Sequence, residues 1–147
     1  PFDDIDDGLG TIPESSRRHC MFLLEELLRI REIKELIHQK DFIWLSKHIN
    51  KSQLSLRNNY EISCPEIDWL SKHLLEIKGV YCTRMIGKGF GGCVLAVMEE
   101  QTVESIQFNF EDYERIFGFH PKLYTCTAGK GITVQNFSET TENKFYR

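Results

Sequence analysis

The feature that most constrains the fold is a change of hydrophobic period after Gly79. Before this glycine, apolar residues recur at the three- and four-residue spacing of helices. After it, residues 80–86 and 93–98 are short runs rich in β-branched, aromatic and aliphatic side chains, which is typical of strands. A turn with four glycines in six residues joins the two runs. The order of helices, strands and helix predicts an α+β domain with an antiparallel sheet and helices packed on one face.

Three helices are predicted before Gly79. The first is expected to begin at a T-x-x-E capping box, residues 11–14, and to run to about His38. Asp41 is the expected N-cap of the second helix, and Ser63, with a glutamate three positions on, is that of the third. The apolar residues at helical spacing are Met21, Leu24, Leu27, Leu28, Ile30, Ile33 and Ile37 in the first helix, and Ile67, Leu70, Leu74 and Ile77 in the third.

The part of the chain after the second strand predicts one more helix and two more strands. Residues 102–117 return to a helical period, and residues 122–127 and 132–134 have the composition of short strands. Residues 1–10 and 135–147 are mostly polar, so we expect a flexible lead-in and a flexible tail. The 147 residues together are expected to form a single domain.

Composition weighs against several classes of protein. The net charge is −4, whereas nucleic-acid binding normally requires a basic face. No apolar run approaches the roughly 20 residues that span a bilayer. The five cysteines include no C-x-x-C pair, which indicates reduced thiols of a cytoplasmic protein and neither a disulfide framework nor a zinc site. The acidic run from Asp3 has the length of a calcium loop, but Ile5 at its third position cannot bind the ion, so no metal site is predicted.

Three blocks of the sequence resemble one family: two long motifs, and the strand-like stretch from Lys122 to Val134, which fits the closing strands of that family. Residues 53–68, Q-L-S-L-R-N-N-Y-E-I-S-C-P-E-I-D, are similar to the helix-to-helix segment of galactokinases, S-L-R-D-x-Y-E-V-S-C-P-E-L-D. Residues 81–93, Y-C-T-R-M-I-G-K-G-F-G-G-C, are similar to the third motif of that family, G-x-R-M-T-G-A-G-F-G-G-C. The resemblance extends from about Arg17 to Val134 and identifies the chain with the C-terminal domain of galactokinases. These belong to the superfamily of galacto-, homoserine, mevalonate and phosphomevalonate kinases.

The resemblance implies a ferredoxin-like C-terminal lobe of a two-lobed sugar kinase. In the full-length protein it implies phosphorylation of galactose to galactose 1-phosphate, with ATP and Mg²⁺ bound mainly by an N-terminal kinase lobe. That lobe would hold the sugar, the catalytic aspartate and the serine-rich phosphate loop, so no catalytic residue is expected here and this chain alone should be inactive. The expected partners are that lobe and galactose or a related sugar, with no nucleic acid and no membrane. Two alternatives stay open: a non-catalytic sugar-sensing or regulatory homologue, and a ligand- or RNA-binding module of the same architecture.

The glycine-rich turn is the candidate binding site. Its residues are Gly87, Lys88, Gly89, Phe90, Gly91 and Gly92. In the family this motif lies close to the phosphate-binding loop, so these residues are expected to contact the nucleotide. The alternative is a tight hairpin in which glycine only relieves strain. The G-x-G-x-x-G pattern is not a dinucleotide fingerprint, because that motif leads from a strand into a helix and this one joins two strands.

Several positions carry two interpretations. Lys88 can contact phosphate oxygens or remain solvated at the tip of a hairpin. Arg57, Tyr60 and Glu61 can line the cleft or tie helix ends together through hydrogen bonds. Cys93 is expected to be a buried and unreactive thiol. The sequence departs from the family pattern at four positions, which are Asn58, Cys82, Ile86 and Lys88.

Overall fold

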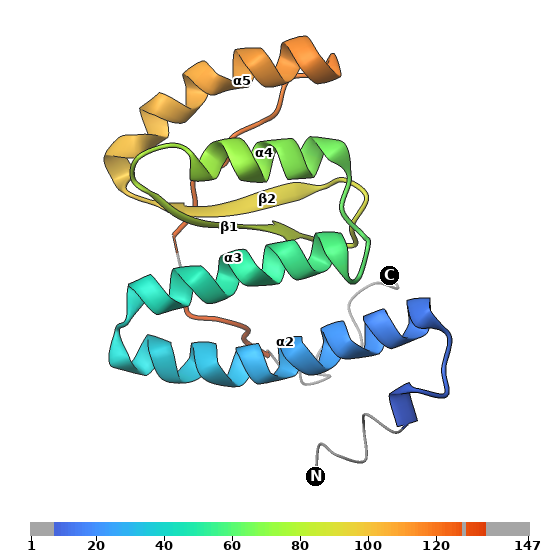
Figure 1. Cartoon of the computed structure of the whole chain (residues 1–147). Coiled ribbons are helices and arrows are strands. Elements are labelled where there is room, and N and C mark those ends of the chain that lie inside the picture. The colour runs from blue at the N-terminus through green and yellow to red at the C-terminus, as the bar shows by residue number, and fades with distance from the viewer. Residues whose placement is uncertain (1–7, 128, 135–147) are drawn as a thin grey trace, which may run out of the picture.

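A computed structural model describes residues 8–127 and 129–134. Figure 1 shows the elements stacked in the order α2, α3, the two strands, α4 and α5. The elements are α2 (Glu14–Gln39), α3 (Phe42–Asn58), α4 (Pro65–Leu75), β1 (Val80–Ile86), β2 (Cys93–Met98), the 3₁₀ turn η1 (Glu100–Thr102) and α5 (Val103–Phe117). The predicted α+β class is confirmed, with an antiparallel sheet of two strands in the described residues.

The two strands form a hairpin whose register decides which side chains face the helices. Ile86 pairs with Cys93 next to the turn, and Thr83 pairs with Ala96 farther along. Side chains alternate between the two faces of a strand. Thr83 and Met85 are therefore on the face that packs against α4, and both side chains are fully buried.

Helix α3 covers the edge of β1 that does not pair with β2. The side-chain oxygen of Asn50 accepts a hydrogen bond from the Thr83 amide at 2.9 Å, and its amide nitrogen donates to the Tyr81 carbonyl at 3.2 Å. One helical turn on, the Gln53 side chain accepts a hydrogen bond from the Met85 amide at 2.7 Å. Two polar side chains thus stand in for a neighbouring strand, and they satisfy backbone groups that would otherwise be buried without partners.

Two hydrophobic clusters hold the helices on the sheet. The first joins Phe22, Leu56, Ile67 and Met85, and so connects α2, α3, α4 and β1. The second joins Leu74 of α4 to Ile106 and Phe110 of α5, with the partly buried side chains of β2 beneath them. The apolar spacing that predicted the buried faces of α4 and α5 is therefore confirmed.

One of the three predicted helix starts is confirmed and two are wrong in detail. Asp41 caps α3, because its carboxylate accepts a hydrogen bond from the Trp44 amide at 3.1 Å. The predicted capping box at residues 11–14 does not form, and the hydroxyl of Thr11 donates to the Gly8 carbonyl instead. Cys64, and not Ser63, is the N-cap residue of α4.

The predicted closing strands are also wrong within the described residues. Residues 122–127 have no regular secondary structure, and neither do residues 132–134. A groove of about 390 Å³ lies between β2, α4, α5 and the segment 119–126, so this segment runs beside the sheet without pairing with it. The expected tail, residues 135–147, and most of the expected lead-in, residues 1–7, lie outside the described residues.

No helix in the described part of the chain combines the length and the apolar character that crossing a bilayer requires.

Candidate functional site

The glycine-rich loop between β1 and β2 is built almost entirely from left-handed backbone. The φ angle is 100° at Gly87, 90° at Gly89, 127° at Gly91 and 97° at Gly92. A residue with a Cβ is strained at such angles, so the repeated glycines follow from the shape of the loop. Phe90 is the exception, because it adopts a φ of 53° although it is not glycine.

The loop is anchored on the connector between α3 and α4. The Phe90 amide donates a hydrogen bond to the Ile62 carbonyl at 2.7 Å. A Cβ on Gly89 would lie 2.6 Å from the same oxygen and 2.8 Å from the Cβ of Ile62, so only glycine allows this approach. The two motifs that carry the family resemblance, residues 53–68 and 81–93, therefore meet in space.

Gly87 and Gly91 lie on the open side of the loop. A Cβ added to either would meet no atom within 4 Å, so their positive φ angles, and not crowding, account for glycine there. Lys88 is exposed, and Phe90 is 74% exposed although its backbone is fixed to the connector. The loop thus exposes a cation and an aromatic ring on a backbone that is bonded to the connector.

Arg57 and Asp68 tie the end of α3 to the start of α4. The Arg57 guanidinium lies 3.2 Å from the Asp68 carboxylate, and the Ser63 hydroxyl donates to that carboxylate at 2.7 Å. This explains why Ser63 does not cap α4: its hydroxyl is engaged by an acid in the first turn of the helix. The structural interpretation of Arg57 is thereby supported.

Tyr60 and Glu61 connect the same segment to α2. The Tyr60 ring stacks on Phe22 with centroids 4.7 Å apart, and the Arg18 guanidinium lies 2.7 Å from the Glu61 carboxylate. Glu61 has a φ of 57°, so the chain turns sharply at this residue. Both side chains hold helix ends in place, as the structural interpretation predicts.

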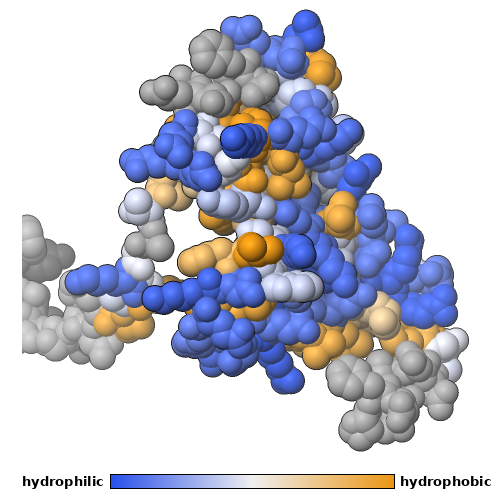
Figure 2. All heavy atoms as spheres, turned by 60° about the vertical axis from the view of Figure 1, so that its left-hand side comes forward, coloured by the Kyte–Doolittle hydropathy of each residue, from blue (hydrophilic) through white to orange (hydrophobic). Residues whose placement is uncertain are grey.

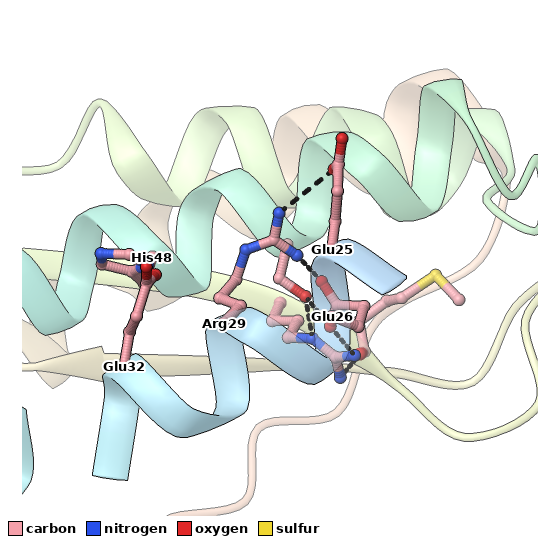
Figure 3. Close-up of polar contacts among 8 residues, drawn as sticks. Glu25, Glu26, Arg29, Glu32 and His48 are labelled. Atoms are coloured by element: carbon pink, nitrogen blue, oxygen red, sulfur yellow. Dashed lines mark hydrogen bonds and ion pairs between the residues drawn. The ribbon is translucent and has the colours of Figure 1, made fainter. Parts of the chain in front are cut away.

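Sequence reasoning missed a group of buried charges beside the loop. Arg84, three residues before Gly87 on β1, donates from Nε to the Ser52 hydroxyl at 2.8 Å, and its guanidinium lies 3.6 Å from the Glu26 carboxylate. Glu26 also accepts a hydrogen bond from Ser52 at 2.8 Å and pairs with Arg29 on its own helix. Figure 3 shows Glu25, Glu26 and Arg29 directed toward one another on α2.

Burial differs within this network: the side chain of Arg29 is 4% exposed, that of Glu26 16% and that of Arg84 34%. Burial lowers the pKa of the Arg84 guanidinium, because desolvation disfavours the charged form. A buried charge is retained only where it is paired, so Glu26 is the structural partner that both arginines require. The spacing of Glu26 and Arg29 could have indicated a helical ion pair, but nothing local in the sequence connects them to Arg84.

Among the described residues, no group of three or more histidine, cysteine or acidic side chains could hold a metal ion.

The two cysteines of the hairpin differ in burial. Cys93 is exposed at the start of β2, so the expected burial of its thiol is wrong. Cys82 is buried instead, and burial raises the pKa of its thiol.

The fold is an α+β domain whose glycine hairpin is anchored on the connector between two helices. Residues 33–114 match the family described as GHMP kinases C terminal, and the chain belongs to this family. Within it, the similarity is to galactokinases. The chain is 39% identical to the putative galactokinase of Treponema pallidum (strain Nichols) over 128 residues, which are 84% of this chain and 32% of that protein. It is 33% identical to the galactokinase of Thermosipho africanus over 117 residues, 79% of this chain and 33% of the relative.

A solved structure confirms the architecture. The structure of Lactococcus lactis galactokinase complexed with galactose matches with a TM-score of 0.70 and 24% identity, over 75% of this chain and 29% of the other. The chain therefore spans about a third of the length of these relatives.

Proposed function

We propose that this chain is the C-terminal lobe of a galactokinase-like enzyme and that its glycine loop closes over the phosphates of ATP. In the full-length protein the γ-phosphoryl group would pass to the anomeric hydroxyl of galactose: the bond from the β,γ-bridging oxygen to phosphorus breaks, and a bond from the sugar oxygen to phosphorus forms. The proton of the hydroxyl goes to a base in the other lobe. The products are ADP and galactose 1-phosphate.

One observation carries this proposal: the two family motifs converge on a single rigid loop. Gly89 packs on Ile62, and the Phe90 amide is bonded to the same residue, whereas Lys88 stays exposed. A hairpin that merely turned the chain would not need an exposed phenylalanine in left-handed backbone. Phosphoryl transfer depends mainly on positioning and on stabilising charge, so a loop of this kind contributes without a reacting group.

The residues present fit part of an ATP site. Lys88 and the accessible backbone at Gly87 and Gly91 suit the anionic oxygens of a nucleotide. The metal that accompanies the nucleotide is Mg²⁺, which prefers carboxylate and phosphate oxygens. We assign it to the other lobe. When bound, ATP supplies the phosphoryl group, and Mg²⁺ neutralises charge on the phosphates.

The test is a comparison of the complete protein in which this chain occurs with the 147-residue chain alone. Each is incubated with ATP, Mg²⁺ and galactose, and galactose 1-phosphate is followed by ³¹P NMR. We expect product from the complete protein only. Turnover by the isolated chain would refute the claim that the catalytic residues lie in the other lobe. A complete protein that binds galactose without consuming ATP would favour the sensing alternative.

A loop variant tests the site in the same assay. Replacing Lys88 by alanine in the complete protein should raise the KM for ATP about three- to fivefold, the effect of losing one exposed charge contact of roughly 1 kcal/mol. Lys122, which is also exposed but lies outside the loop, is the matched control. An unchanged KM in Lys88→Ala would remove this residue from the phosphate site.

A further inference from the structure

The middle of α2 has its polarity inverted, with charged side chains facing the domain and apolar ones facing outward. Phe22, Glu26 and Arg29 follow one another at four- and three-residue intervals, so they share the face that points to the rest of the domain. On this face Arg29 is only 4% exposed and pairs with Glu26. Leu27, one position beyond Glu26 and thus about 100° around the helix, is 60% exposed.

Five large apolar side chains make up the outward face of α2. They are Met21, Leu23, Leu27, Leu28 and Ile30, between 37% and 61% exposed. A surface helix of a globular protein normally turns its apolar stripe to the core and its charges to water. In Figure 2, orange hydrophobic side chains reach the surface in places at the lower edge of the molecule, among hydrophilic ones. Contiguous exposed apolar surface of this kind marks a binding face.

Rotation of α2 about its axis cannot bury these leucines. Glu26 is bound to Ser52 of α3 and to Arg84 of β1, and Phe22 belongs to the first hydrophobic cluster. Turning the helix would separate Glu26 from Ser52 and Arg84 and leave the partly buried Arg84 without its counter-charge. The polar contacts therefore fix the outward face of α2 as it is.

The N-terminal half of α2 also contacts the segment that anchors the glycine loop. It meets the α3–α4 connector through the Phe22–Tyr60 stack and the ion pair of Arg18 with Glu61. The next residue of that connector, Ile62, holds the loop.

We infer that the outward face of α2 is the docking surface for the other lobe of the complete kinase. This inference rests on the proposed function, which requires that lobe. The matched part is 32% of the Treponema relative and 29% of the solved Lactococcus chain, so the larger part of each relative lies outside it. The occupant should present an apolar, uncharged surface, as permanent interfaces do at their centre.

Hydroxyl-radical footprinting of the complete protein tests the docking surface without using activity. In the folded complete protein, oxidation of Leu27 and Ile30 should be about fivefold slower than expected from their exposure here, because the centre of an interface is packed like a protein interior. Ile116 on α5, 54% exposed, is the matched control and should react freely. A second sample lacks residues 135–147, and each sample is measured at several dilutions.

The outcomes separate the possible occupants. Protection that persists on dilution and after removal of residues 135–147 supports the other lobe. Loss of protection on dilution would assign the face to a second copy of the chain. Loss of protection on truncation would assign it to the chain's own tail. Either result overturns the inference, and so does free oxidation of Leu27. If Leu27 and Ile30 are protected but the complete protein forms no galactose 1-phosphate, the interface is supported and the proposed function is refuted.

Discussion

At the scale of single residues, Gly89 is the position where the loop and the connector come closest. Replacing it by alanine should destabilise the chain by about 1–3 kcal/mol, because the new Cβ combines a strained φ with an approach of 2.6 Å to the Ile62 carbonyl. The midpoint of urea unfolding measures this change. Gly87→Ala is the control, since it has a positive φ but open space around the Cβ, and it should cost clearly less. Equal losses would mean that packing on Ile62 contributes nothing.

Cys82 makes a pH-dependent contribution to stability at the same scale. Burial raises the pKa of its thiol above the ordinary value of 9.0, so the folded chain holds this proton more tightly than the unfolded chain. The contribution is complete below about pH 9 and is lost as the pH rises through the pKa of the folded state. Stability measured above pH 9 should therefore fall less steeply in Cys82→Ala than in the unchanged chain. The exposed Cys93, replaced in the same way, is the control for loss of a thiol.

At the scale of elements, the contact between α3 and β1 depends on side chains that replace a missing strand. Gln53→Leu would leave the Met85 amide buried without an acceptor, and we expect a loss of about 1–3 kcal/mol in the free energy of unfolding. Gln39→Leu makes the same chemical change at an exposed position. Its free energy of unfolding should stay within about 0.5 kcal/mol of that of the unchanged chain. If both variants unfold at the same urea concentration, α3 does not cap the edge of β1 in the way described.

The packing of α2 depends in turn on Glu26. Glu26→Gln removes one of the two carboxylates beside Arg29 and the counter-charge of the partly buried Arg84, and we expect a loss of about 1–3 kcal/mol in the free energy of unfolding. Glu35→Gln, at an exposed position on the same helix, is the control for loss of one charge. Thermal unfolding followed by circular dichroism compares the two variants. A Glu26 variant as stable as the control would show that the network contributes no net stability.

The elements also show what local patterns can predict. The hairpin was predictable because runs of β-branched residues and the glycines between them are local signals. The buried faces of α4 and α5 were predictable because apolar spacing, such as that of Ile67 and Leu74, is also set within a few residues. The N-cap of α4 was not, because the Ser63 hydroxyl bonds to Asp68 in the first turn of the helix. The strand expected at residues 122–127 was wrong because a β-rich composition does not itself provide a pairing partner.

At the scale of the whole molecule, the orientation of α2 could not be predicted from the chain. Its apolar spacing predicted the helix but not which face is covered, because Glu26 meets Arg84 only in the folded state. The candidate loop was predictable as a motif, and its anchoring on Ile62 was not, since that contact joins segments from different elements. What the sequence could indicate was the family, because each of the two motifs is long and continuous.

The proposed function requires the glycine loop to lie against a bound nucleotide. Hydrogen–deuterium exchange of the complete protein, with and without a non-hydrolysable ATP analogue, measures this directly. We predict slower exchange in the peptide that covers residues 86–93 when the analogue is bound, and no change in a peptide covering residues 111–117 of α5. Analogue binding that leaves residues 86–93 unprotected would contradict the account.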